Sequence, residues 1–205
     1  TALVGLDGFV DLIVNPVDQR FGPGLDFKAI PTIEDFGHRV LSAAGKSTNI
    51  EMYKRREKLG GNGPILANAV LEAGIATRYI GALGEPAVHP VFEQFAARTE
   101  AVSLANPGVT HALEFDDGKL LLGDLTSLDE LDFRRIVDRT GEGMLLDIVS
   151  RADLFAMVNW TMIPYMTGIL QDFLDKVFPH LGPRDHRQFF FDLADPAKRS
   201  DGDLA

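Results

Sequence analysis

The sequence predicts an α/β protein with a mostly parallel central sheet. Short apolar segments of the length of buried strands alternate with helical patterns along the chain, and such alternation favours a parallel sheet with right-handed crossovers. These strand segments are residues 2–6, 75–80, 154–158 and 188–191. With 205 residues, the chain is long enough to bury a substantial core, so the simplest expectation is one α/β domain over residues 1–205.

Composition and charge exclude several classes of protein. The formal net charge of −10 argues against nucleic acid or an anionic membrane as a partner, because phosphate groups are bound by clustered Lys and Arg. The chain has no cysteine, which excludes disulfides, thiolate catalysis and Cys-based metal sites. No apolar run approaches the ~20 residues that span a bilayer. We therefore expect a cytoplasmic protein without a nucleic-acid or membrane partner.

Residues 59–84 predict a glycine loop, a helix and a strand, in that order. Pro64 is typical of the first position of a helix, where its missing N–H is no loss. Gly74 is typical of the left-handed residue just beyond a helix end. The Ala-rich apolar segment between them is then the helix, and residues 75–80 are the strand.

Two glycines and an asparagine directly before a helix are suited to bind a ligand. Gly60 and Gly61 let the backbone approach a ligand closely and adopt positive φ. The first N–H groups of a helix have no partner within it and can bond a hydroxyl or an anion. The Asn62 side chain both donates and accepts hydrogen bonds. A tight turn with an asparagine cap explains the same residues equally well.

Polar residues also follow the predicted strands. Asp7 and Asp11 come after the first strand, and Asn159 follows the strand at 154–158. Ligands of parallel α/β sheets bind outside the carboxyl ends of the strands, so these three side chains are candidates to bind hydroxyl groups there. For Asp7, a role as a helix cap or turn residue is an equal alternative.

Two further apolar segments are expected in the core. After Pro164, apolar residues recur at helical spacing, and Phe189–Phe191 reads as a buried strand. The helical set comprises Met166, Ile169, Leu170, Phe173, Leu174 and Val177.

Residues 109–124 predict a β-hairpin, because Asp116-Asp117-Gly118 lies between two alternating segments. Asp116 and Asp117 are therefore expected to be turn residues and not a catalytic pair.

Together these features resemble the ribokinase-like (PfkB-type) carbohydrate kinases. Gly60-Gly61 before a helix and the turn Gly81-Ala-Leu-Gly84 are similar to the first signature of that family, and Gly5 followed by Asp11 is similar to its N-terminal pattern. The resemblance implies a ribokinase-like three-layer sandwich with a small β-hairpin lid, whose strands lie at about 12–16 and 109–124. A homodimer through the lid is compatible with it.

The resemblance also implies an activity. Such kinases transfer the γ-phosphoryl group of ATP, with Mg²⁺, to a hydroxymethyl group of a sugar or nucleoside-like substrate. Asp11 first and Asp7 second would bind the sugar hydroxyls, and Gly60, Gly61 and Asn62 would line the opposite side. The sequence departs from the family at Ile65, where many relatives have an asparagine, so Asn62 or Asn68 would have to replace that contact.

The second signature of the family, G-A-G-D, has no counterpart in the sequence. In the family its aspartate is the general base, and its glycine N–H groups stabilise the transferred phosphoryl group. We therefore expect an incomplete ribokinase-like domain that does not catalyse by itself, and we assign no catalytic residue, ATP ligand or metal ligand in this chain.

Two other functions fit parts of the sequence. One is a non-catalytic sugar- or nucleoside-binding module that has kept the cleft and lost the chemistry. The other is a metal-dependent phosphohydrolase that uses Asp192 and Asp195. That class needs carboxylates two residues apart at a strand end, and these are three apart, so the sequence disfavours it.

Overall fold

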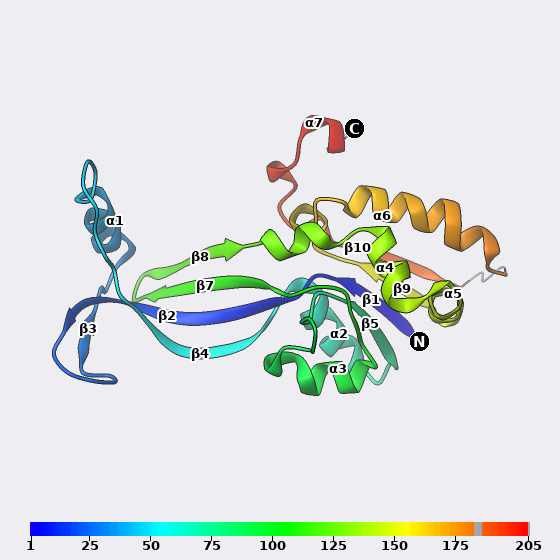
Figure 1. Cartoon of the computed structure of the whole chain (residues 1–205), viewed down its shortest axis with the longest axis horizontal. Helices are drawn as coiled ribbons and strands as arrows, with labels where there is room; N and C mark the ends of the chain where they lie inside the picture. The colour runs from blue at the N-terminus through cyan, green and yellow to red at the C-terminus, as the bar shows by residue number, and fades with distance from the viewer. Residues whose placement is uncertain (183–185, 205) are drawn as a thin grey trace. The chain divides into compact units, whose positions relative to one another are not determined.

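The computed structural model describes residues 1–182 and 186–204, and Figure 1 shows the course of the chain. The chain divides into two compact units, and each is described by itself. The core unit comprises Thr1–Val10, Leu59–Gly108 and Leu125–Ala205. The strand unit comprises Asp11–Lys58 and Val109–Asp124.

The core unit is built on a parallel five-stranded sheet with the order β10-β9-β1-β5-β6. Its strands are β1 (Ala2–Leu6), β5 (Thr77–Gly81), β6 (Val102–Ser103), β9 (Leu154–Met157) and β10 (Gln188–Phe191). The predicted α/β class and parallel sheet are thereby confirmed. Strand β6 was not predicted, because a two-residue strand leaves no apolar run.

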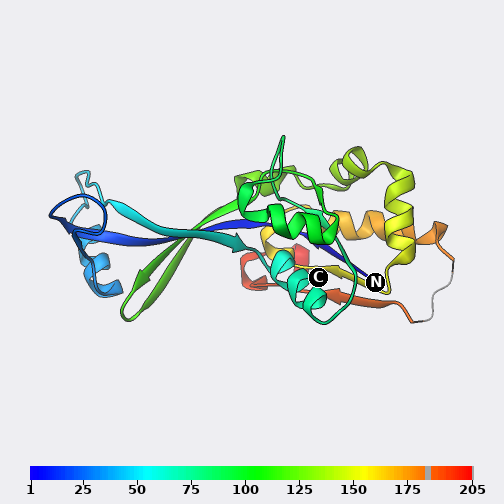
Figure 2. The ribbon, with the colours of Figure 1, turned by 90° about the horizontal axis from the view of Figure 1, so that it is seen from below.

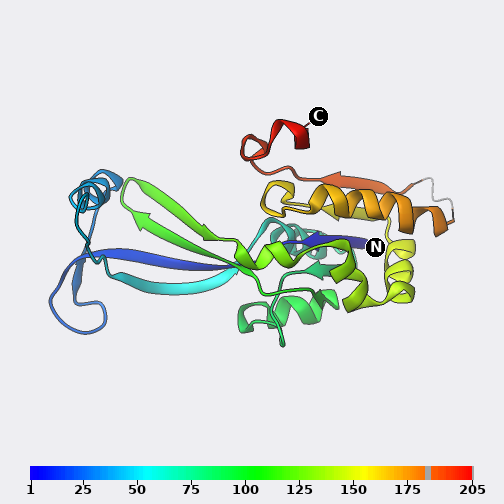
Figure 3. The same ribbon diagram turned by 45° about the horizontal axis from the view of Figure 1, so that its top comes forward.

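Helices cover both faces of this sheet, as Figures 2 and 3 show. On one face lie α2 (Asn62–Glu72) and α3 (Glu93–Thr99). On the other lie α4 (Phe133–Thr140), α5 (Glu142–Arg151) and α6 (Met166–Asp172), and the short α7 (Asp201–Leu204) follows β10. None of the helices within the described ranges is long and apolar enough to cross a membrane.

Phenylalanine rings fill the interface between the sheet and α6. Phe155 on β9 and Phe173 at the end of α6 are each 1% exposed, and their ring centroids lie 5.1 Å apart. Of the helical set predicted for the core, Met166, Ile169, Phe173 and Val177 are buried.

Leu174, by contrast, is 58% exposed, so its prediction as a core residue was wrong. It lies one position beyond Phe173 in the π-helical turn Phe173–Val177, and its side chain points away from the buried side that Phe173 occupies.

Strand β10 differs from its prediction as a buried strand. Phe189, Phe190 and Phe191 are 51%, 46% and 48% exposed. The reason is the position of β10 at the edge of the sheet, where it pairs with β9 and, within the described residues, with no strand on its other side. A continuous apolar run is typical of an interior parallel strand, so the composition of β10 alone did not reveal its exposure.

The strand unit contains a second five-stranded sheet and one helix. Strands β3 (Phe27–Ala29), β2 (Phe9–Arg20), β7 (Gly108–Phe115) and β8 (Gly118–Asp124) follow one another in the sheet, and β4 (Met52–Gly60) pairs with β2. The helix is α1 (Ile33–Leu41). A few residues at the ends of β2, β4 and β7 belong to the core unit. This sheet is larger than the lid expected from strands at about 12–16 and 109–124, because β2 is longer than expected and the strands β3 and β4 were not predicted.

The hairpin between β7 and β8 has the predicted turn. Phe115 pairs with Gly118, which leaves Asp116 and Asp117 as the two turn residues. The Asp117 carboxylate accepts a hydrogen bond of 3.0 Å from the N–H of Ile33, at the start of α1. Asp117 therefore has a structural partner within the strand unit.

Phe173→Ala should lower the free energy of unfolding of the core unit by about 3–5 kcal/mol, because it leaves a cavity among the rings of Phe133, Phe155 and Phe178. Leu174→Ala, at the neighbouring exposed position, should change it by less than about 1 kcal/mol. Urea titration followed by the fluorescence of Trp160, the single tryptophan, measures both. Equal losses in the two variants would contradict the described packing.

Candidate functional site

Four polar side chains meet where the carboxyl ends of β1, β9 and β10 approach the start of α2. They are Asp7, Asn62, Asn159 and Asp192, and hydrogen bonds join them in a closed cycle, which we call the polar ring. This end of a parallel sheet is where ligands of α/β proteins bind. The ring is therefore the candidate functional site of the core unit.

Asp7 is the buried member of the ring, with 0% exposure. One carboxylate oxygen accepts hydrogen bonds from the backbone N–H of Asn62 (2.9 Å) and from Asn159 Nδ2 (2.7 Å). The other accepts the backbone N–H of Gly63 at 2.7 Å. The main-chain oxygen of Asp7 accepts the hydroxyl proton of Tyr79. The carboxylate thus binds the first free N–H groups of α2, where the positive end of the helix dipole stabilises a negative charge.

Burial raises the pKa of Asp7 from 3.8 to about 6. The hydrogen bonds from Asn159, Gly63 and Asn62 act in the opposite direction, and the nearby charge of Asp192 adds to the rise. Desolvation therefore outweighs the three donors.

The glycines of the loop allow this close approach. Gly61 has φ +97°, and a Cβ atom there would lie 3.1 Å from Asp7 Oδ2. A Cβ atom on Gly63 would lie only 2.5 Å from Asp7 Oδ1. Because Asp7 takes the N–H groups of Asn62 and Gly63, α2 begins at Asn62. The prediction that Pro64 occupies the first helical position was therefore wrong by two residues.

Asp192 is the partly exposed member of the ring. Its Oδ2 atom accepts hydrogen bonds from Asn62 Nδ2 (2.6 Å) and from the backbone N–H of Asn159 (3.2 Å). Its Oδ1 atom accepts the N–H of Ala194 at 2.9 Å. Partial burial raises the pKa of Asp192, but these three hydrogen bonds outweigh it, so the pKa lies below its ordinary value.

Asn159 links the two carboxylates of the ring. It directly follows β9 and has the left-handed conformation (φ 63°), which a short polar residue tolerates better than most others. Its backbone N–H points to Asp192 and its side-chain N–H to Asp7. Its side-chain oxygen is buried and has no hydrogen-bond partner among the described residues.

The structure brings most of the predicted site residues into one unit. Asp7, Asn62 and Asn159 belong to the ring, Gly61 lies against Asp7, and the neighbouring Gly60 is buried at the end of β4. Their role as substrate ligands stays a prediction. Asp192 was predicted only as a residue of the disfavoured phosphohydrolase and not as a ligand of sugar hydroxyls, although it follows the fourth predicted strand just as Asp7 follows the first.

Asp11 belongs to the strand unit and is partly buried there. Burial raises the pKa of its carboxyl, while the charge of Lys58 and a hydrogen bond with Thr110 lower it, and the net shift is upward. Its role as the first ligand of the sugar hydroxyls stays a prediction.

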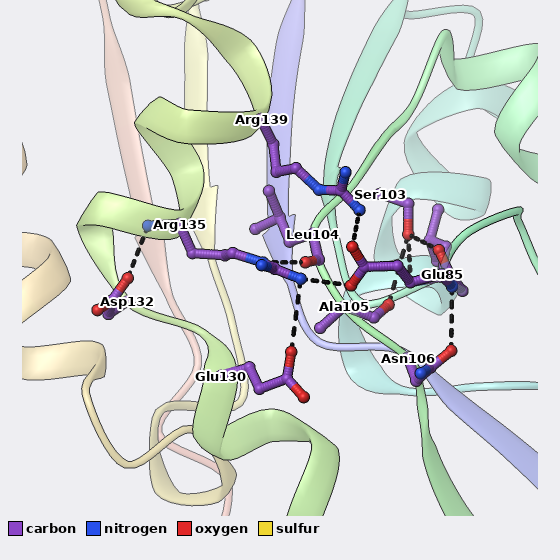
Figure 4. A network of polar contacts seen from close by, with 11 residues as sticks. Glu85, Ser103, Leu104, Ala105, Asn106, Glu130, Asp132, Arg135 and Arg139 are labelled. Atoms are coloured by element: carbon purple, nitrogen blue, oxygen red, sulfur yellow. Dashed lines mark hydrogen bonds and ion pairs between the residues drawn. The ribbon is translucent and has the colours of Figure 1, made fainter.

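A second polar network fixes the turn that ends at Gly84, and Figure 4 shows it. The Ser103 hydroxyl donates to the carbonyl oxygen of Gly84 at 2.7 Å. The Glu85 carboxylate accepts hydrogen bonds from both Arg135 and Arg139 of α4. The network ties the ends of β5 and β6 to α4. Since its charges pair with one another, it is structural support and not a site.

The raised pKa of Asp7 should make the core unit less stable as the pH rises. Between pH 3.8 and pH about 6, Asp7 holds a proton in the folded state and has lost it in the unfolded state. This contribution is fully present below pH ~4 and is lost above pH ~6, and it amounts to about 3 kcal/mol. Urea titrations of the wild type and of Asp7→Asn between pH 4 and 8 should show this fall in the wild type only.

Asp195→Asn serves as a control in that experiment, because Asp195 is 57% exposed and lies outside the ring. It should keep the wild-type slope. The same slope in Asp7→Asn as in the wild type would show that another group is responsible.

Comparisons with known proteins agree with the described fold. A family model described as prokaryotic ketohexokinase matches residues 1–205. A ketohexokinase from Haloferax volcanii is 30% identical over 181 residues, which cover 87% of this chain and 48% of that protein. The chain thus spans about half the length of this curated relative.

A solved structure shows the same fold. The crystal structure of a fructokinase from Xylella fastidiosa superposes with a TM-score of 0.59 at 14% identity, over 98% of this chain and 53% of that one. At this identity the likeness concerns the fold alone, and it confirms the ribokinase-like architecture. Because the family match extends over every residue of the sequence, the chain belongs to the prokaryotic ketohexokinase family, within the ribokinase-like carbohydrate kinases.

Proposed function

We propose that this chain forms the sugar-binding part of a kinase that transfers a phosphoryl group from ATP to a hydroxymethyl group of a ketohexose. Family membership supports the class of reaction, and the similarity to the ketohexokinase from Haloferax volcanii supports the class of sugar. The observation that carries the proposal is the polar ring at the carboxyl ends of three parallel strands.

The ring has the chemistry that a sugar hydroxyl needs. A hydroxyl group both donates and accepts, so a carboxylate and an amide side by side match it well. Asn62 is exposed and Asp192 is partly exposed, whereas Asp7 lies behind them with no exposed surface. Asp7 therefore holds the ring in place, and its role as a direct hydroxyl ligand is the weaker part of the sequence prediction.

The other predicted residues have distinct roles in the proposal. Gly60 and Gly61 are proposed to line the side of the substrate opposite Asp11, and Asn159 presents an amide at the end of β9. Asp11 is proposed as a further ligand of the sugar hydroxyls. Phosphoryl transfer depends mainly on positioning and on electrostatic stabilisation, and these residues would supply the positioning of the acceptor.

In the proposed kinase, the residues that hold ATP and Mg²⁺ are not assigned to this chain. Within the described ranges, no group of three or more His, Cys, Asp or Glu side chains is placed to hold a metal ion, and G-A-G-D is absent from the sequence. We therefore assign no residue to ATP and derive no step through it. The general base would have to come from residues outside this sequence.

A non-catalytic sugar- or nucleoside-binding module is the second candidate. The same ring supports it, since a binding site can exist without a base.

The test uses a longer form of the protein that carries a G-A-G-D signature, with ADP release measured against a panel of ketohexoses and nucleosides. Asp11→Ala should lower kcat/KM by about 100-fold or more, because a ligand hydroxyl loses a charged partner. Asp26→Ala, at another position of the strand unit, should leave it within about twofold. Sugar binding without any ADP release would favour the binding module, and unchanged kcat/KM in Asp11→Ala would remove Asp11 from the site.

A further inference from the structure

We propose that Asp192 is a direct ligand of the substrate's hydroxyl groups and that Asp7 is the positioning residue behind it. The inference rests on the proposed function and assigns the roles of the two carboxylates in the polar ring. The sequence analysis considered Asp192 only as a residue of the disfavoured phosphohydrolase, and the comparisons assign it no role.

The two carboxylates differ in access. Each accepts three hydrogen bonds, and a carboxylate offers about four acceptor positions. Both thus retain one position, but Asp7 has 0% exposure and Asp192 is partly exposed. A ligand that arrives from solvent can use the remaining position of Asp192. On this carboxylate, Oδ1 is the oxygen with a single protein donor.

The donors that hold Asp192 are neutral amides from Asn62, Asn159 and Ala194. They orient the carboxylate without neutralising it. Its negative charge therefore remains available to strengthen a hydrogen bond from a hydroxyl group, since hydrogen bonds to charged acceptors are roughly twice as strong as neutral ones.

The loop that carries Asp192 is fixed to the loop after β9. The backbone N–H of Trp160 donates to the main-chain oxygen of Asp192 (3.0 Å), and the hydroxyl of Thr161 donates to that of Leu193 (2.7 Å). Ala194 has φ 57°, a conformation that costs a non-glycine residue energy and is found where surrounding contacts impose it.

Arg199 adds a further connection between the same two loops. Its guanidinium lies over the Trp160 ring, 4.6 Å from the centroid, and donates to the carbonyl oxygens of Ile163 (2.6 Å) and Pro164 (3.1 Å). Only 10% of its side chain is exposed. The position of Asp192 is thus set before any ligand binds, which reduces the entropic cost of binding.

An independent observation also indicates a ligand at the ring. The Asn159 side-chain oxygen is buried, its residue is 5% exposed, and no donor among the described residues reaches it. A buried acceptor without a donor is costly. A hydroxyl group at the ring is a donor of the kind that this oxygen lacks.

The test is calorimetric titration of D-fructose into the protein, for the wild type, Asp192→Asn and the control Asp195→Asn on the same loop. Loss of a charged acceptor should weaken binding by about 10- to 100-fold in Asp192→Asn, and by less than about twofold in Asp195→Asn. Thermal unfolding of each variant establishes that it is folded.

Deoxy analogues of D-fructose separate a direct contact from a structural effect. If Asp192 bonds one hydroxyl, the analogue that lacks this hydroxyl should bind the wild type more weakly than D-fructose does. The same analogue should bind Asp192→Asn with the affinity that it has for the wild type. If Asp192→Asn weakens every analogue by the same factor, Asp192 has only a structural role and the proposal is overturned. If the wild type binds every analogue as tightly as D-fructose, the proposal is overturned without any variant.

The outcomes distinguish this proposal from the proposed function. A wild-type protein that does not bind D-fructose overturns both. A wild type that binds, together with an Asp192→Asn variant of equal affinity, overturns only the role of Asp192.

Discussion

The bond between a buried carboxylate and the start of a helix is the interaction on which the rest of the core unit depends. Asp7 directly follows β1 and has no exposed surface. Its carboxylate accepts hydrogen bonds from the backbone N–H groups of Asn62 and Gly63. An ionised carboxylate that is removed from water costs several kcal/mol unless donors replace its hydration. The N–H groups at the helix start and the side-chain amide of Asn159 supply such donors, and the Tyr79 hydroxyl donates to the main-chain oxygen of Asp7. Together these bonds fix where β1, α2, β9 and β5 meet.

This constraint explains the glycine loop better than ligand binding alone does. Gly61 and Gly63 leave room for the Asp7 oxygens, at positions where a Cβ atom would lie within 3.1 Å and 2.5 Å of them. The first N–H groups of α2, which the sequence left available for a substrate, are used by the protein itself. In the proposed function, the side chains around this helix start would therefore recognise the substrate, and its backbone N–H groups would not.

The sequence predicted features that depend on local chemistry. Gly74 ends α2 with φ +81°, and the Asp-Asp turn of the β7–β8 hairpin formed as expected, because each depends on a few neighbouring residues. The predictions failed where contacts with residues distant in the sequence determine the structure. Pro64 was misplaced because Asp7, 55 residues from Asn62, moves the helix start. The exposure of Phe190 depends on its place in the strand order, which composition does not contain, and Asp192 acquires its role only from Asn62 and Asn159.

The two carboxylates of the ring show how position alone separates the roles of identical side chains. Asp7 is wholly buried, and desolvation raises its pKa to about 6; Asp192 is partly exposed, and its amide donors hold its pKa below the ordinary value. Near neutral pH, Asp192 is thus the carboxylate that is more fully ionised, and it is also the one that solvent reaches. Asp7 cannot exchange its donors for a ligand without disrupting the start of α2. Burial and hydrogen bonding together underlie the proposed division into an inner carboxylate that orders the ring and an outer one that contacts the sugar.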